Sequence, residues 1–324
     1  MTEKTGRMTT IEDFEEVKQR SLWLDALDRL IRNKAALFGL FICTVIMFTA
    51  IFGSYLAPKD YLRTDIYRIA EGPTRDFLLG TDLVGRDVLS RLMHGARTAV
   101  FAAAITIILG NIIGISMGAL AGFFRGIVDD IIMRITDILF SFPDFLFAAF
   151  LSASIRTPVV KMMGNLKQKT GWGILDETIF IDYIILFGAL AVVNWSGTAR
   201  MVRGQVLSLR EQDFVRAEVA LGIPTWTIIR KHLVPNSIAP LIVGISQGIG
   251  GILLLESSLS FFGLGVQPPA ASWGDMINTA LPLWRQHPWL VLSPGLLLGI
   301  AVFGFNYLGD GVNDALNRSQ IRRY

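Results

Sequence analysis

The chain of 324 residues is poor in cysteine, in histidine and in charge. Its one cysteine, Cys43, lies inside an apolar run, which excludes an intrachain disulfide and argues against a cysteine-based metal site. Its histidines, His94, His232 and His287, lie far apart and on different sides of the topology derived below, so all three cannot share one metal ion. Charged residues make up only 18% of the chain, against about 25% in an ordinary soluble domain.

Hydrophobic residues account for 52% of the chain, and they are gathered into long blocks. A hydrocarbon core about 30 Å thick needs roughly 20 apolar residues in helical form. The stretches that reach or approach this length are residues 35–57, 99–124, 131–155, 183–199, 238–262 and 289–308. The sequence therefore predicts an all-α polytopic membrane protein with six transmembrane helices.

Two local patterns predict how these stretches pack. Glycine recurs every fourth residue in the second stretch, at Gly110, Gly114 and Gly118. Small residues at this spacing let two helix backbones approach closely, so we expect the second stretch to lie tightly within the bundle. Arg134 and Asp137, near the start of the third stretch, share a helix face, and we expect them to form an ion pair.

The distribution of lysine and arginine indicates the orientation of the chain in the membrane. These residues lie mostly between the apolar blocks, and with the N-terminus inside they are more numerous in inner than in outer segments, as is usual for membrane proteins. We interpret them as topology signals and expect no nucleic-acid partner. The predicted division is a cytoplasmic segment 1–34, a six-helix domain 35–317 and a cytoplasmic tail 318–324, with outer loops at about 58–98, 156–182 and 263–288 and an inner loop at about 200–235. Residues 162–177 are polar, and we expect them to form a flexible excursion of the second outer loop.

The inner loop between the fourth and fifth stretches predicts a helix, an elbow and a second helix. Asp213 is suited to cap a short helix over residues 214–221, and Gly222 is suited to the left-handed position that ends it. Pro224 suits the first turn of the second helix, and Pro235 follows before the chain re-enters the membrane. Small side chains keep the elbow free of bulk, as a docking surface requires; they are Ala217, Ala220 and Gly222.

The order of residues in this loop resembles the cytoplasmic loop shared by permeases of ATP-binding-cassette (ABC) importers. In that family the loop runs Glu-Ala-Ala, three residues, Gly, nine residues, Ile, one residue, Leu-Pro. Here Ala217 and the spacing to Gly222 and Pro235 are kept. Four positions depart in residue type, with Arg216 for Glu, Glu218 for the second Ala, His232 for Ile and Val234 for Leu.

Other segments resemble the dipeptide and oligopeptide permeases, specifically the second of their two paired subunits. These segments are LLGTDLVGRDVLSRLMHGARTA (78–99), DIIMRITDILFSFP (130–143), ARMVRGQVLSLREQDFVRA (199–217), ESSLSFFGLGVQPPAASWGDM (256–276) and FNYLGDGVNDALN (305–317). Together they cover all six stretches in the family order, from about residue 33 to residue 317.

This resemblance implies the type I ABC importer permease fold and a role in peptide uptake. It implies that the short inner-loop helix rests in a groove of a cytosolic ATPase, through Arg216, Ala217, Glu218, Ala220, Leu221, Gly222, Pro224 and Pro235. The implied partners are a second, homologous permease subunit that forms a heterodimer with this chain, two cytosolic ATPase subunits and an extracytoplasmic solute-binding protein. The implied location is the bacterial plasma (inner) membrane. Family members carry dipeptides, longer peptides, metal chelates or some sugars, and the motifs do not distinguish these cargoes.

We expect no catalytic site, no metal and no cofactor on this chain, with ATP and Mg bound by the ATPase subunits. Residues 164–170 are the nearest approach to a phosphate-binding loop, but Gln168 stands where the second glycine of GxxxxGK[ST] is required. A membrane-embedded enzyme would need a nucleophile and a base at matching depth, and only Ser141, Asp144 and Asn194 are loosely suitable. A stand-alone secondary carrier commonly shows inverted repeats, which the sequence lacks. Co-purification with ATPases would separate these classes from a transporter subunit.

Candidate residues of the translocation pathway or its gate are Asp144, Asn194 and Glu256. Asp144 follows Pro143 inside the third stretch, where a charge costs about 2.5–3.5 kcal/mol on insertion scales, so it should face the bundle or a wet cavity. It either lines the pathway and meets a cationic group of the cargo, or is a buried acid that pairs with Asn111, Asn194 or a partner subunit or masks the backbone freed by Pro143. Glu256 lies in the outer third of the fifth stretch, where we favour a structural role at the outer gate over contact with cargo.

Overall fold

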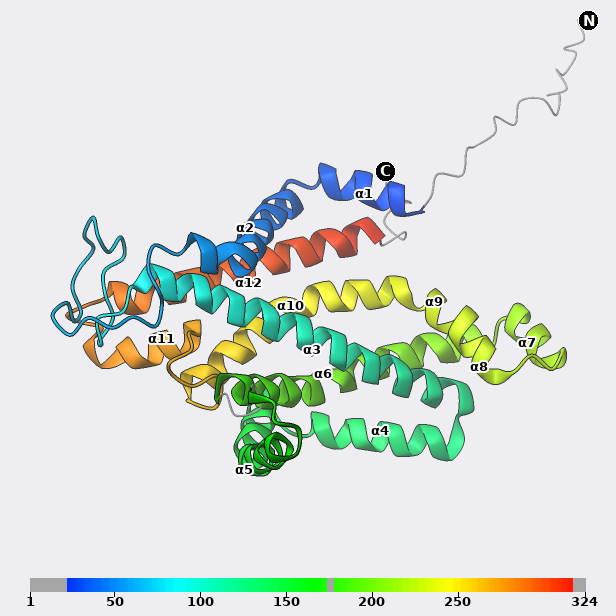
Figure 1. Cartoon of the computed structure of the whole chain (residues 1–324). Helices are drawn as coiled ribbons and strands as arrows, with labels where there is room; N and C mark the ends of the chain where they lie inside the picture. The colour runs from blue at the N-terminus through cyan, green and yellow to red at the C-terminus, as the bar shows by residue number, and fades with distance from the viewer. Residues whose placement is uncertain (1–21, 174–177, 317–324) are drawn as a thin grey trace, which may run out of the picture.

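The computed structural model describes residues 22–173 and 178–316, and this part of the chain is built from helices without a strand (Figure 1). In chain order the helices are α1 (Leu22–Arg32), α2 (Lys34–Leu56), α3 (Val88–Phe124), α4 (Gly126–Phe140), α5 (Asp144–Thr170), α6 (Thr178–Arg210), α7 (Asp213–Ala220), α8 (Thr225–Ile228), a π-helical segment (Ile229–Leu233), α9 (Val234–Asn236), α10 (Ile238–Phe261), α11 (Trp273–Ala280), a 3-10 turn (Leu281–Leu283) and α12 (Trp289–Leu316). Six of them, α2, α3, α5, α6, α10 and α12, are long and apolar enough to cross a membrane. The predicted all-α class with six membrane helices is confirmed.

The long helices form a bundle whose two ends differ in character. At one end lie α11 and the segment 57–87 before α3; at the other lie α7 and α8 (Figure 1). We call these the α11 end and the α7 end. The start of the described chain, α1, packs beside α12 at the α7 side of the bundle.

The most extensive helix contact joins α3 to α6, and glycines on α3 form it. A Cβ atom added at Gly114 would lie 2.7 Å from the carbonyl oxygen of Trp195, and one at Gly118 would collide with the carbonyl oxygen of Ala199. The expected close packing at Gly110, Gly114 and Gly118 is therefore confirmed, and Gly122 extends the same seam against Val206. Because the backbones touch without intervening side chains, van der Waals packing is dense along the whole seam.

The third stretch, expected as one helix over 131–155, is broken. α4 ends at Phe140 and α5 begins at Asp144, and α5 is seen end-on in Figure 1 while α4 runs along α6. Pro143 has no N–H to donate and disfavours the helical conformation of Phe142. At the end of α4 the Ser141 hydroxyl donates a hydrogen bond to the Asp137 carbonyl (2.8 Å). The break therefore follows from local chemistry that the hydrophobicity of the stretch conceals.

Three of the expected loops contain more helix than the sequence indicated. The loop at 156–182 is largely helical, because α5 continues to Thr170 and α6 begins at Thr178, so residues 162–170 are helix rather than a flexible excursion. Residues 174–177 and the tail 318–324 lie outside the described residues. α3 begins at Val88, inside the expected loop 58–98, and α6 runs to Arg210, inside the expected loop 200–235. Hydrophobicity underestimated these helices because their ends carry charges outside the apolar window.

The expected Arg134–Asp137 pair is replaced by a contact between helices. Asp137 on α4 accepts a hydrogen bond from Arg200 on α6 (2.6 Å). A second ion pair joins the same two helices, between Asp129 near the start of α4 and Arg203 of α6. These two ion pairs hold α4 against α6.

Replacing Gly114 with Ala should destabilise the protein by about 1–3 kcal/mol, because the added methyl group must displace the α6 backbone. Thermal unfolding of the detergent-solubilised protein measures this change. Gly204→Ala on α6 is the matched control, since nothing lies within 4 Å of its Cβ position, and it should be neutral or slightly stabilising. Equal effects of the two substitutions would contradict the seam.

Candidate coupling loop and transmembrane cavity

The helix expected over residues 214–221 is α7 (Asp213–Ala220), and its C-terminal end has the conformation that the sequence indicates. Gly222 has φ +74°, its N–H donates to the Val219 carbonyl (3.0 Å), and the N–H of Ile223 donates to the Glu218 carbonyl (3.1 Å). This is the Schellman arrangement, in which a left-handed residue reverses the chain after a helix. Nothing lies within 4 Å of a Cβ atom placed at Gly222, so the backbone conformation, not crowding, requires glycine there.

The predicted helix starts in this loop are displaced by one residue. Gln212, with extended backbone angles, occupies the N-cap position of α7, and Asp213 is the first helical residue, where its negative charge still favours the helix dipole. Pro224 likewise precedes α8 instead of lying in its first turn. Assigning Asp213 as the cap was therefore wrong, although its effect on the helix has the same sign.

The expected second helix is interrupted by a π-helical segment. α8 has four residues, and the chain then passes through the segment Ile229–Leu233 before Pro235 lies in the first turn of α9. Pro235 has no N–H for the usual helical hydrogen bond, and the side-chain amide of Asn236 donates to the His232 carbonyl (2.6 Å). Short π segments of this kind are frequent at functional sites.

The elbow has one buried and one exposed face. Val215, Ile228 and Leu233 are buried and pack in one cluster with Val202 and Val206 of α6. On the opposite side, Leu221 is 79% exposed and Trp226 is 63% exposed, and the large side chains Phe214 and Val219 are exposed beside them. We call Phe214, Val219, Leu221 and Trp226 the elbow surface. Sequence reasoning named Leu221 but missed Trp226, whose position four residues beyond the elbow glycine was the available signal.

Ion pairs tie α7 to the turn between α3 and α4. Arg216, where the family pattern has an acid, donates to Glu211 (2.7 Å), and Glu211 also pairs with Arg125. The hydrogen bonds from Arg216 and then from Arg125 lower the pKa of the Glu211 carboxyl, so this acid stays ionised at neutral pH. The basic departure at Arg216 therefore has a local partner.

Asp144 and Asn194 are brought together on one cavity. This cavity has a volume of about 470 Å³, and its lining includes Asp144, Asn194, Gly248, Gly251 and Ser258. Asp144 is exposed, and within the described part of the chain no hydrogen bond or ion pair engages its carboxylate. The interpretation that Asp144 pairs with Asn111 is not what the structure shows, because Asn111 accepts a hydrogen bond from Thr198 instead (3.0 Å).

A second cavity of about 230 Å³ shares Asn194, Gly197 and Gly248 with the first and continues toward Met201 and Leu241. Nothing lies within 4 Å of Cβ positions at Gly248 or Gly251. These α10 glycines therefore leave room beside the helix, whereas the α3 glycines close a helix contact.

Comparison with known proteins identifies the family of the chain. The family model of binding-protein-dependent transport system inner membrane components matches residues 110–322, and a model of the N-terminal membrane domain of oligopeptide transport permease C matches residues 21–73. The oligopeptide transport system permease protein OppC of Bacillus subtilis is 35% identical over 94% of this chain and 93% of its own length. The chain belongs to the dipeptide/oligopeptide permease family of ABC transporters.

Further relatives of this permease carry different cargo names. The dipeptide transport system permease protein DppC of Bacillus subtilis is 36% identical over 96% of this chain and 90% of its own length. The glutathione transport system permease protein GsiD of Pectobacterium atrosepticum is 34% identical over 97% of both chains. The type I permease fold and the resemblance drawn from the motifs are thus confirmed.

Glu256 of the permease does not line the Asp144 cavity. Its side chain is 1% exposed, and it accepts hydrogen bonds from Ser257 (3.1 Å), Ser260 (2.9 Å) and Ser272 (3.0 Å). Ser272 is the N-cap residue of α11. The carboxylate therefore joins α10 to the beginning of α11, and the structure does not bring it together with Asp144 and Asn194.

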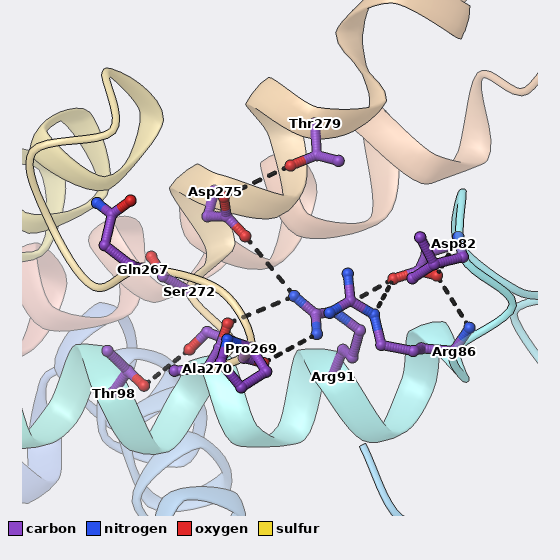
Figure 2. A network of polar contacts seen from close by, with 12 residues as sticks. Asp82, Arg86, Arg91, Thr98, Gln267, Pro269, Ala270, Ser272, Asp275 and Thr279 are labelled. Carbon is purple, nitrogen blue, oxygen red and sulfur yellow. Dashed lines mark hydrogen bonds and ion pairs between the residues drawn. The ribbon is translucent and has the colours of Figure 1, made fainter. Parts of the chain in front are cut away.

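Arg91 is the centre of a buried polar network at the α11 end (Figure 2). Its side chain is 2% exposed and lies 3.5 Å from Asp82 and 3.6 Å from Asp275. It also donates to the carbonyl oxygens of Pro269 (3.4 Å) and Ala270 (3.5 Å). Burial raises the pKa of the Asp275 carboxyl, and the Arg91 guanidinium opposes this shift.

The network was missed from the sequence, because Arg91 counted there as one of several charges in an outer loop. Instead it lies in the first turn of α3 and joins this helix to α11 and to the segment before α3. Beside it, the Trp273 indole N–H donates to the Leu92 carbonyl (3.0 Å), and Gly95 leaves the space for the ring. The α11 end is thus fastened to α3 by both polar and apolar contacts.

Arg91→Gln should destabilise the permease by about 3 kcal/mol, because two largely buried carboxylates lose their shared cation. The thermal unfolding midpoint of the purified permease measures the loss. Arg285→Gln is the control, since Arg285 is exposed beside Trp284 and such contacts contribute little. A midpoint that falls equally in both variants would rule out a special role for Arg91.

Proposed function

We propose that this chain is one of two membrane-spanning subunits of an ATP-driven bacterial importer of di- or oligopeptides. The other spanning subunit is a second, homologous permease. Two cytosolic ATPase subunits bind ATP and Mg and hydrolyse ATP, and an extracytoplasmic solute-binding protein delivers the peptide. The protein lies in the plasma (inner) membrane with both termini in the cytoplasm, which places the α7 end inside and the α11 end outside.

The observation that carries this proposal is the elbow at Gly222. A connecting loop between two spans has no reason to present large apolar side chains to water, yet the elbow surface does so from a fold that is anchored on its other face. Exposed apolar patches on an otherwise polar surface mark protein contacts, and an exposed Trp is a frequent anchor of such contacts. We infer that the elbow surface rests in a groove of an ATPase subunit.

The cavity supports the transport part of the proposal. One chain lines only part of a route, with Asp144 and Asn194 on its wall, so a second permease is required to enclose it. The relatives named for dipeptides, oligopeptides and glutathione favour a peptide as the cargo. A peptide amine would then be the cationic group that meets Asp144.

Gly222→Val should lower peptide-stimulated ATP hydrolysis and uptake by about fivefold or more, because a β-branched residue in the left-handed region costs at least roughly 1–2 kcal/mol. The measurement uses the purified complex of this chain with its partner permease and ATPases, reconstituted with loaded binding protein. Gly171→Val is a closely matched control: Gly171 ends α5 with φ +73°, and nothing lies within 4 Å of its Cβ position either.

The control should retain stimulation, and the isolated ATPases should stay active in every case. If the ATPases do not associate with this chain, or if Gly222→Val behaves like Gly171→Val, the elbow is only a connector. The proposed coupling of ATP hydrolysis through the elbow would then be wrong.

Asp144→Asn should reduce peptide uptake by about tenfold, the effect expected from losing one charge-assisted contact, while the complex still assembles. Uptake into proteoliposomes and the yield of complex measure the two effects. Asp310→Asn is the control, since Asp310 is exposed at the end of α12. Unchanged uptake with Asp144→Asn would remove the contact between this acid and the cargo.

A further inference from the structure

A carboxylate and an imidazole face each other across the elbow. Oε1 of Glu218 on α7 lies 3.3 Å from Nε2 of His232 in the π-helical segment. Glu218 is 16% exposed at its side chain and His232 is 39% exposed, so the contact is partly withdrawn from water. Both residues stand at positions where the loop departs from the residue types of the family pattern, and here the two departures contact each other.

The burial of Glu218 makes this contact more than a surface ion pair. Its second carboxylate oxygen, Oε2, is buried, and no hydrogen-bond partner reaches it within the described part of the chain. A carboxylate in such a place is unfavourable unless a cation or donor lies beside it, and His232 is the side chain within ion-pair distance. By contrast, the side chains of Arg216 and Glu211 are 62% and 50% exposed, and exposed pairs contribute little.

The position of the contact gives it a mechanical consequence. Between α7 and the π-helical segment lie only residues 221–224, which include Gly222 and Pro224, and the short helix α8. A left-handed glycine with open space around it is a point at which the elbow can bend. Val215 of α7 packs with Ile228 and Leu233, and the contact between Glu218 and His232 adds a polar connection between the same two segments, which opposes bending at Gly222.

Beyond the π-helical segment the chain leads directly into α10. Ile229 and Leu233 of the segment are buried against α6, and the hydroxyl of Ser237 donates to the Leu233 carbonyl (2.9 Å) just before α10 begins. α10 carries Gly248 and Gly251 on the wall of the cavity. A movement transmitted across the elbow to His232 would therefore reach the helix that lines the transport route.

We propose that Glu218 and His232 form a positioning clamp, which makes α7 and the returning segment move as one unit and so sets how much ATP hydrolysis is converted into peptide transport. This rests on the proposed function, since it assigns a role to two residues of the same coupling loop. The proposed role requires no contact of either residue with ATP or cargo. The clamp acts on the ratio of ATP hydrolysed to peptide transported, and not on the hydrolysis itself.

The experiment measures ATP hydrolysis and peptide uptake in the same proteoliposomes, with the complete transporter and its loaded binding protein. His232→Ile and Glu218→Ala should each raise the ATP used per peptide about two- to fivefold, the factor expected from losing one partly exposed polar contact. The double variant should be no worse than the more affected single variant, because the two residues share one interaction. His232→Lys, which places an N–H donor opposite Glu218, should retain the native ratio.

Asp28→Ala is the control, because Asp28 pairs with Arg32 on α1 in a contact exposed to water and remote from the elbow. It should leave the ratio unchanged. If His232→Ile fails to assemble, Glu218→Gln supplies the measurement, since it removes the charge while keeping the shape of the side chain.

The clamp is overturned if the single variants keep the native ratio, if their effects add in the double variant, or if His232→Lys behaves like His232→Ile. A native complex that hydrolyses ATP without any peptide uptake would overturn the proposed function together with the clamp. Native coupling that survives all of these substitutions would overturn the clamp alone.

Discussion

Along α3, four glycines one helical turn apart face α6 and leave no room for a side chain between the two backbones. In a membrane, where lipid tails are as apolar as leucine, close packing of this kind drives helix association. Any rotation of α3 about its axis would move the glycines away from α6 and carry larger neighbours into its backbone. The pair therefore behaves as one rigid element. Both α3, with 37 residues, and α6, with 33 residues, extend beyond the seam toward the α11 end, and both end near the α7 end.

The two ends that this pair supports use polar groups in different ways. At the α11 end Arg91 (Figure 2) and Glu256 are almost fully buried, and the contacts described for them lie within the protein. Removing one partner there would leave an uncompensated charge, so the end is held in one arrangement. At the α7 end the ion pairs of Arg125, Glu211 and Arg216 are partly exposed, which makes them weaker and easier to rearrange. This asymmetry fits the proposed contact between the α7 end and an ATPase subunit.

Several features of this fold and its candidate site could be predicted because their causes are local in the sequence. The six membrane helices follow from apolar stretches of the length that a bilayer needs, and the left-handed conformation of Gly222 follows from the short helix that it ends. The same reasoning was wrong at Asp213 and Pro224 by one residue, since two neighbouring residues can begin a helix at nearly equal free energy. It was wrong at residues 141–143 because the apolar character of the stretch was given more weight than Pro143.

What the sequence by itself determined is the class, the number of membrane helices, the family and the position of the elbow, all of which depend on composition and spacing along the chain. Only the tertiary structure decided which side chains meet: Asp137 with Arg200 instead of Arg134, Asn111 with Thr198 instead of Asp144, and Arg91 with Asp82 and Asp275. Partners of this kind come from helices far apart in the chain, and their choice depends on the rotation and depth of each helix in the bundle. Packing sets these two quantities, and no periodicity within a single helix encodes them.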